Sequence, residues 1–139
     1  MSRAKKWRGR AGTVRAMAAL AGARILIATA PFERWRTRLG FVAKTTKPCQ
    51  DAAAAEARRL ASQVERAAAR LPFETKCLPR AMALSWLLRR KGIGHILVFA
   101  VRPPELRDSP DALHAWVEVA GTKVIGDLPG PWLETLRLG

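Results

Sequence analysis

Apolar residues recur at helical spacing in the first two thirds of the chain. From 12 to 29 the apolar positions are Val14, Met17, Ala18, Ala21, Ile25 and Ala28. Steps of three or four residues are typical of an amphipathic helix. The alanine-rich segment 52–70, with Asp51 as a candidate N-cap, predicts a second long helix. A third is predicted from Cys77 to about Arg90, since Pro79 in its first turn loses no helical hydrogen bond.

The last third of the chain changes to strand patterns. Residues 95–102 are nearly all apolar, which indicates a central strand. Residues 114–120 and 122–125 flank Gly121 and predict a hairpin. Asp127 then opens a turn, and 132–137 reads as a short tail. Helices followed by strands predict an α+β domain with an antiparallel sheet.

The remaining segments are short. Pro31 fits the first turn of a short helix that reaches Leu39 and stops at Gly40. Residues 43–50 and 103–110 are expected to be loops. Its 139 residues give the chain room for one core, so we expect a single domain.

Positive charge gathers in the N-terminal third. The net charge is +14, of which +11 lies on residues 1–48 and only +3 on 49–139. We therefore divide the chain into a basic helical extension, 1–48, that packs on a core formed by 49–139. Such a field attracts an acidic peptide, an acidic protein surface, nucleic acid or a lipid surface, and charge alone does not choose among them.

The N-terminus imitates a targeting signal. A basic start and an apolar stretch that ends in Ala-Thr-Ala at 28–30 fit a cleavable signal. Arg24 interrupts the stretch, and neither flanking run reaches the ~18 residues that span a bilayer. The pattern favours an amphipathic helix over a signal peptide or membrane anchor.

Cysteine, histidine and aspartate occur in the order used by papain-like and transglutaminase-like thiol enzymes. Cys77 begins a predicted helix, His114 lies on a strand, and Asp127 follows the next strand. A helix N-terminus carries about half a positive charge and an imidazole can take the thiol proton, so both lower a cysteine pKa. We predict Cys77 as nucleophile, His114 as general base and Asp127 as the acid that orients the imidazole.

Alternation along the second strand places its side chains. His114, Trp116 and Glu118 should share one face, with Val117 and Val119 on the other. We expect the valine face to pack on a helix and the histidine face to look at the start of the Cys77 helix. Glu118 is the main rival to Asp127 as orienting acid.

Other candidates are weaker. Asp111 is a lesser rival as orienting acid, and His95 is expected to be structural because it enters a buried strand. The Cys77 backbone N–H is a natural first oxyanion donor. Neither Gln50 nor Gln63 has an obvious position as the second.

The second cysteine, Cys49, lies in a predicted loop. A bridge between Cys49 and Cys77 is possible but would consume the nucleophile, so a reducing cytosol is the simpler assumption. Two cysteines 28 residues apart, with no Cys-x-x-Cys pair, indicate no zinc site. We expect no metal or cofactor.

Two sequence blocks resemble a known family. Cys77-Leu-Pro-Arg-Ala and His114-Ala-Trp-Val-Glu, with Asp127 beyond, are similar to the transglutaminase-like leader peptidases of lasso-peptide biosynthesis, the peptidase half of the B protein. The pattern Pro31-Phe-x-x-Trp-x-x-Arg-Leu-Gly also resembles the opening of that family. The resemblance covers most of residues 15–130.

This resemblance implies a papain/transglutaminase-like single domain and a cytoplasmic cysteine protease. The protease would remove the leader from a ribosomally made precursor before an ATP-dependent cyclase acts. The resemblance also implies a stand-alone peptidase that works with the precursor leader and a separate small leader-binding protein, and it leaves the cyclase open as a further partner.

Two rival functions stay open. The same thiol chemistry could transfer an acyl group to an amine, as in transglutaminases. Alternatively, a non-enzymatic basic protein could bind nucleic acid or an acidic partner. The few aromatic residues, with no interleaved basic platform, make nucleic acid the less favoured partner. A membrane surface is also less favoured.

Overall fold

A computed structural model describes residues 3–35, 51–73, 75–106 and 112–139. The helices are α1 (Arg3–Thr29), α2 (Phe32–Trp35), α3 (Asp51–Arg70) and α4 (Cys77–Arg90), and a 3-10 turn covers Pro104–Leu106. The strands are β1 (Ile96–Val101), β2 (Leu113–Val119), β3 (Thr122–Ile125) and β4 (Leu133–Leu138). All pairings in the sheet are antiparallel, which confirms the predicted α+β class.

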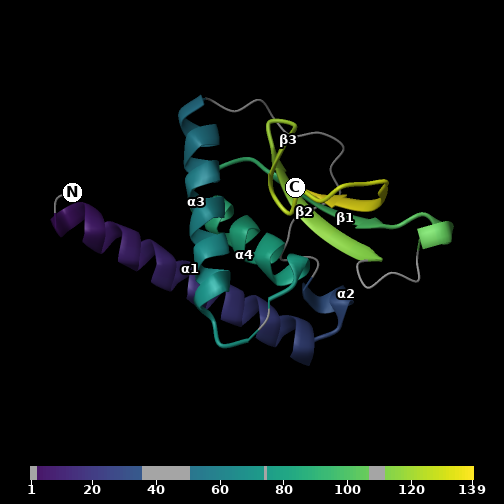
Figure 1. Cartoon of the computed structure of the whole chain (residues 1–139), viewed down its shortest axis with the longest axis horizontal. Helices are drawn as coiled ribbons and strands as arrows, with labels where there is room; N and C mark the ends of the chain where they lie inside the picture. Colours follow the sequence, from purple (N-terminus) through teal and green to yellow (C-terminus); the bar gives the residue numbers. More distant parts are fainter. Residues whose placement is uncertain (1–2, 36–50, 74, 107–111) are drawn as a thin grey trace.

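The helices form one side of the molecule and the sheet the other, with α4 between α1, α3 and the strands (Figure 1). α4 is buried along most of its length because it packs on both layers; its fully buried residues include Met82, Leu84 and Leu88. α1 contributes Leu20 to the same core and α3 contributes Val64. The core that positions Cys77 is therefore shared by all three long helices.

α1 is longer than the predicted helix over 12–29, since it begins at Arg3. By length and composition, Arg10–Thr29 could also cross a membrane, a test that core helices and N-terminal signals pass as well. Ala16, Leu20 and Ala23 are fully buried, and α1 contacts both α3 and α4. In this structure α1 therefore packs as a core helix along one face.

The sheet order is β3-β2-β1-β4, so β1 is central as predicted. β2 and β3 form the predicted hairpin, whose turn residues Ala120 and Gly121 both have positive φ. The interpretation of 132–137 as a tail is wrong, because all of these residues except Trp132 belong to β4, which pairs with β1. Thr135 of β4 donates its hydroxyl to the carbonyl of Phe99, a residue 36 positions earlier in the chain. The local pattern of β4 cannot reveal a pairing partner that far away in sequence.

The faces of β2 alternate as predicted. Val117 and Val119 join the core cluster that contains α4, whereas Trp116 joins a small cluster on the opposite face. The expectation that the histidine face as a whole looks at the start of α4 is wrong, since that face is turned away from the helices. Cys77 meets His114 near the start of β2. This part of β2 is not paired with β3, because that pairing covers only Val117 to Val119.

His95 serves the core, as expected. Its Nε2 lies 2.7 Å from Ser85 Oγ and its Nδ1 lies 2.9 Å from the Ile93 carbonyl. The geometry has the Ser85 hydroxyl donating to Nε2 and Nδ1–H donating to Ile93. Burial lowers the pKa of His95, which favours the neutral imidazole. Through its bond to Ser85, His95, the residue just before β1, links that strand to α4.

Candidate active site

Cys77 is the first residue of α4, and it is a free, half-buried thiol. Its predecessor Lys76 has extended backbone angles and makes no side-chain cap. First-turn amide groups of a helix have no carbonyl partner within the helix and carry partial positive charge. The structure therefore places the sulfur at the electropositive end of α4.

The Cys77 sulfur is hydrogen-bonded to the His114 imidazole. It also accepts hydrogen bonds from the backbone N–H groups of Ala115 and Leu78. Burial raises the pKa of the Cys77 thiol and is the largest single effect. The hydrogen bonds and the charge of His114 together outweigh burial, so the pKa of Cys77 lies below its ordinary value. This arrangement favours a thiolate paired with an imidazolium.

The other side of the His114 ring is held by backbone. Nε2 makes a short hydrogen bond with the Gly126 carbonyl, just after β3. Because that nitrogen donates, Nδ1 is the nitrogen left to face the thiol. Burial lowers the pKa of His114, but the bonds to Cys77 and Gly126 and the attraction of the thiolate outweigh burial and raise it.

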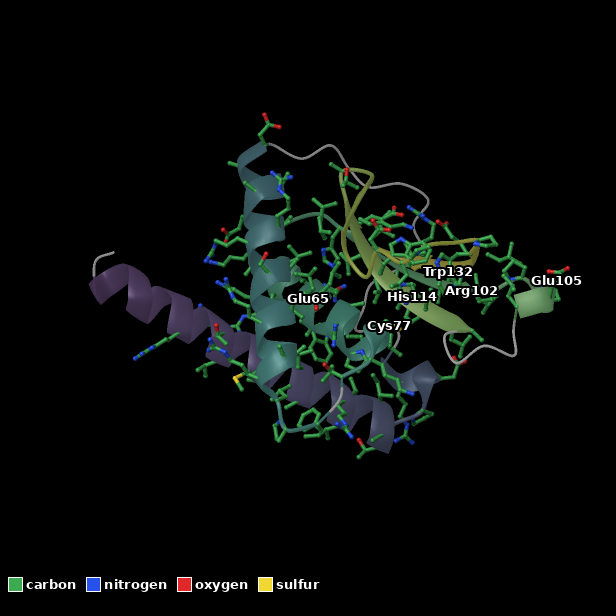
Figure 2. The ribbon with its side chains drawn as sticks, viewed as in Figure 1. Glu65, Cys77, Arg102, Glu105, His114 and Trp132 are labelled. Carbon is green, nitrogen blue, oxygen red and sulfur yellow. The ribbon has the colours of Figure 1, made fainter. Side chains whose placement is uncertain are left out.

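An aromatic side chain covers the imidazole. Trp132 stacks on His114 with ring centroids 4.9 Å apart, and the Arg102 guanidinium lies 3.8 Å from the centre of the Trp132 ring. Arg102 also donates to the Pro129 carbonyl over 3.0 Å. Figure 2 shows Cys77 at the start of α4, with His114, Trp132 and Arg102 gathered at the sheet beside it. The 126–132 loop thus encloses the histidine.

Sequence reasoning missed Gly126, Trp132 and Arg102. One sequence signal was available for Trp132: it directly follows the Leu-Pro-Gly-Pro turn. A large aromatic residue is uncommon in a solvent-exposed turn, so its presence there indicates that the side chain packs against another part of the protein. The Gly126 carbonyl carries no side-chain signal at all.

Asp127 lies at the rim of the site, but its carboxylate does not contact His114. Its side chain is 78% exposed and lies 3.9 Å from Lys123 Nζ. The carbonyl of the preceding residue, Gly126, takes the position predicted for the acid. The structure therefore brings Cys77 and His114 together but does not place the Asp127 carboxylate against the imidazole. The catalytic role of Asp127 stays a prediction.

The rival acids are placed differently. Glu118 accepts the Trp116 indole N–H over 3.0 Å and pairs with Arg137 over 2.7 Å. It lies on the same face of β2 as His114 but four residues further along the strand. Asp111, Cys49 and Gln50 lie outside the described residues, as do 36–39 of the predicted short helix and the 43–50 loop.

Two depressions flank the thiol. The polar one has a volume of about 490 Å³; its charged lining residues are Glu65, Arg80, Lys123 and Asp127. Arg80 binds Glu65 over 2.9 Å and the buried Thr75 hydroxyl over 3.3 Å. The apolar one has a volume of about 410 Å³; its apolar residues include Leu78, Phe99, Val101, Leu113 and Leu136. A chain crossing Cys77 would meet different chemistry on each side.

The Cys77 N–H remains the candidate first oxyanion donor. Gln63 lines a separate cavity far along α4 and is no candidate for the second. Among the described residues no group of three or more His, Cys, Asp or Glu could hold a metal ion. The arrangement can supply a thiolate nucleophile, a proton donor and acceptor at one imidazole, and at least one backbone amide for an oxyanion.

The family model of the transglutaminase-like superfamily matches residues 10–135. The chain therefore belongs to the transglutaminase-like superfamily. The fold, with helices and a small antiparallel sheet in one α+β domain, is typical of cysteine-based enzymes with protease or acyltransferase activity. No curated protein and no solved structure matches the chain.

Proposed function

We propose that this protein is a cysteine protease that removes the leader peptide from a ribosomally made lasso-peptide precursor before macrocyclisation. The observation that carries the proposal is the Cys77–His114 pair at the start of α4, with a depression on either side of the thiol. The resemblance of the Cys77-Leu-Pro-Arg-Ala and His114-Ala-Trp-Val-Glu blocks to such peptidases supports this substrate.

The proposed reaction has two steps. The Cys77 thiolate attacks the carbonyl carbon of the scissile peptide bond, while the Cys77 N–H and the helix N-terminus stabilise the oxyanion. The C–N bond breaks as the His114 imidazolium gives its proton to the departing amine. His114 then takes a proton from water, whose oxygen attacks the thioester carbonyl carbon. The C–S bond breaks, the leader leaves with a C-terminal carboxyl group, and the thiolate–imidazolium pair is restored.

The two depressions are compatible with a peptide that crosses the thiol. The apolar one, bounded by Phe99, Leu113 and Leu136, can receive an apolar side chain beside the cleaved bond. The polar one offers Lys123 and Arg80 to polar or acidic neighbours. Both are small, so recognition of a whole leader gains from a separate leader-binding protein that tethers the precursor and raises its effective concentration.

This function places the protein in the cytoplasm, where precursors are made and a cyclase can use the product. Two alternatives remain distinguishable. In a transglutaminase-type acyl transfer, an amine would replace water and join two groups rather than split one. A non-enzymatic basic protein would bind nucleic acid or an acidic partner and would not need a reactive thiol.

The first prediction tests the proposal directly. Cys77→Ala should abolish cleavage of the precursor while the circular dichroism spectrum and melting temperature stay close to those of the wild type. Cys49→Ala is the matched control and should be nearly silent. The products are read by mass spectrometry, which also separates hydrolysis from acyl transfer. Cleavage that persists in Cys77→Ala would end the thiol-protease proposal.

A further inference from the structure

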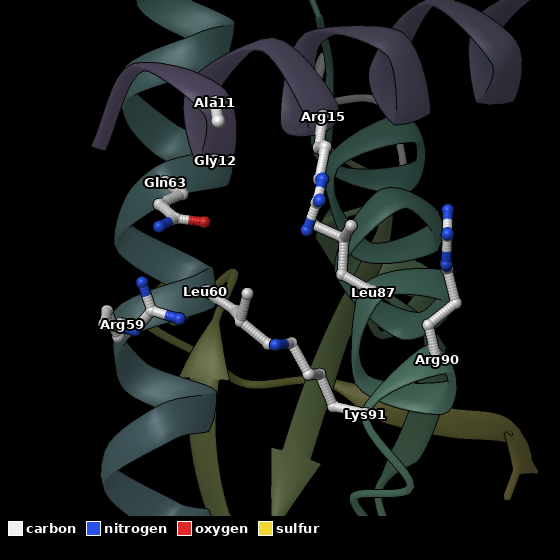
Figure 3. A pocket seen from close by; sticks show the side chains of 9 residues that line it. All are labelled: Ala11, Gly12, Arg15, Arg59, Leu60, Gln63, Leu87, Arg90 and Lys91. Carbon is white, nitrogen blue, oxygen red and sulfur yellow. The ribbon is translucent and has the colours of Figure 1, made fainter. Parts of the chain in front are cut away.

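A cavity of about 290 Å³ lies at the opposite end of α4 from Cys77. Its lining comes from three helices and the residue after α4: Ala11, Gly12, Arg15, Arg59, Leu60, Gln63, Leu87, Arg90 and Lys91. Figure 3 shows Arg15 extending from α1 and Lys91 extending from the end of α4 toward Leu60 of α3. Since α4 has 14 residues, the thiol is roughly 20 Å away. The cavity is therefore separate from the candidate active site.

Positive charge converges on this cavity. Of its four basic residues, Arg59 pairs with Glu56 at 2.5 and 2.8 Å, and Lys91 lies 4.0 Å from the same carboxylate. Arg15 and Arg90 have no acidic partner in the described parts of the chain. Glu56 thus pairs with two of the four cations and leaves Arg15 and Arg90 without an acidic partner in the described residues, and like charges held close together favour an added anion.

Gln63 gives an independent sign of a ligand. Its side chain is only 4% exposed and lines the cavity, yet it makes no hydrogen bond within the part of the chain that the structure describes. A Cβ on Gly12 would lie 2.5 Å from Gln63 Nε2 and 2.8 Å from Oε1, so glycine leaves space for this amide beneath α1. The Gln63 amide atoms are not among the fully buried, unpartnered atoms, so they reach the cavity and can bind a polar group there.

We propose that this cavity binds a carboxylate side chain from an acidic segment of a partner protein. The planar guanidinium groups of Arg15 and Arg90 match carboxylate geometry, and the Gln63 amide can donate to the same group. Leu60 and Leu87 supply apolar contact for the methylene groups of a glutamate. The volume is at the lower limit of small-molecule pockets, so it suits one side chain better than a nucleotide.

The binding test uses a fluorescein-labelled hexaglutamate peptide, with labelled hexaglutamine as the uncharged control. Fluorescence anisotropy is measured on the full chain at fixed ionic strength. The double variant Arg15→Gln/Arg90→Gln should weaken hexaglutamate binding by about tenfold or more. The matched control Arg66→Gln/Arg70→Gln removes the same charge from exposed positions on α3 outside the cavity and should change binding by less than about twofold.

Gln63→Leu separates a built site from a diffuse basic surface. It keeps the charge and nearly the volume of the side chain but removes the amide, so binding should weaken by about three- to tenfold. A melting curve for each variant confirms folding. Equal losses in both double variants, or unchanged binding in Gln63→Leu, would overturn the proposal.

Inorganic phosphate tests the other source of negative charge. At matched ionic strength, 10 mM phosphate should leave hexaglutamate bound, since ~10 mM exceeds what a specific phosphate site would need. Displacement that disappears in Arg15→Gln/Arg90→Gln would assign the cavity to phosphate and overturn the carboxylate proposal. The assay requires no catalysis, so failure here and failure of the protease proposal are separate outcomes.

Discussion

At the scale of single residues, the site depends on a thiol and an imidazole that shift each other's pKa in opposite directions. The pKa of Cys77 is lowered and that of His114 is raised. Between the two values the thiolate–imidazolium pair dominates. Below that window the thiolate gains a proton, and above it the imidazolium loses the proton that the leaving amine requires.

The second prediction concerns the pH dependence of Cys77 alkylation. Because the thiol pKa is lowered, the iodoacetamide reaction should remain fast at a pH where an ordinary cysteine is protonated. His114→Ala removes the hydrogen bond and the charge but leaves the burial, so the profile should move to higher pH. Stopped-flow or mass-spectrometric rates between about pH 5 and 10 cover the range. Identical profiles for the two proteins would show that His114 does not activate the thiol.

The third prediction separates the acid from the backbone carbonyl. Since the Gly126 carbonyl holds the imidazole and Asp127 is exposed, Asp127→Asn should retain cleavage within about threefold of the wild type. His114→Ala should lose about 10²–10⁴-fold. The measurement is kcat/KM on the precursor. A loss above tenfold in Asp127→Asn would restore the acid to the catalytic group, and a greater loss in Glu118→Gln would transfer that role to Glu118.

At the scale of elements, the β3–β4 connection decides how the histidine is held. It supplies the Gly126 carbonyl on one side of the ring and Trp132 across its face. Gly126 has φ of +79°, and an added Cβ would lie 2.7 Å from the Ala115 carbonyl of β2. Only glycine lets the chain turn this close to β2.

The fourth prediction follows from that approach. Gly126→Ala should displace the carbonyl from His114, raise the pH at which Cys77 reacts, and lower kcat/KM by about tenfold or more. A positive φ should add a stability loss of about 1–2 kcal/mol. Gly94→Ala is the matched control, because a Cβ there meets nothing within 4 Å. A profile like that of the wild type in Gly126→Ala would mean that the carbonyl does not position the ring.

At the scale of the whole molecule, α1 belongs to the same hydrophobic core as α4. Leu20 is fully buried in the cluster that also contains Met82 and Leu84 of α4. Because α1 and α4 share this core, loosening α1 should lower the stability of the whole domain, including the helix that carries the nucleophile. The opposite face of α1 leaves Val14 63% exposed.

The fifth prediction is that α1 unfolds together with the rest of the domain. Leu20→Ala should lower the free energy of unfolding by about 2–5 kcal/mol, whereas Val14→Ala should change it by less than about 0.5 kcal/mol. Urea unfolding is followed by circular dichroism and by tryptophan fluorescence. Separate transitions for the two signals, or a small loss in Leu20→Ala, would show that α1 is an appendage and not part of the core.

The sequence by itself determined what depends on local pattern. Helical periodicity and the Pro79 position predict α4 with its observed bounds, and an apolar run predicts β1 as central. Residue order predicts that Cys77 and His114 meet, because the chemistry of each side chain and the type of its element can be read along the chain. These features need no knowledge of distant partners.

Only the tertiary structure decided what depends on distant segments meeting. Pairing across the sheet turned the supposed tail into β4, and the end of the β2–β3 pairing opened the place where Cys77 reaches His114. The partner of the histidine is a backbone carbonyl, which every residue possesses and which no sequence pattern can single out. Asp127 looked suitable because its type is right, but its side chain turns to solvent one residue after the atom that holds the ring.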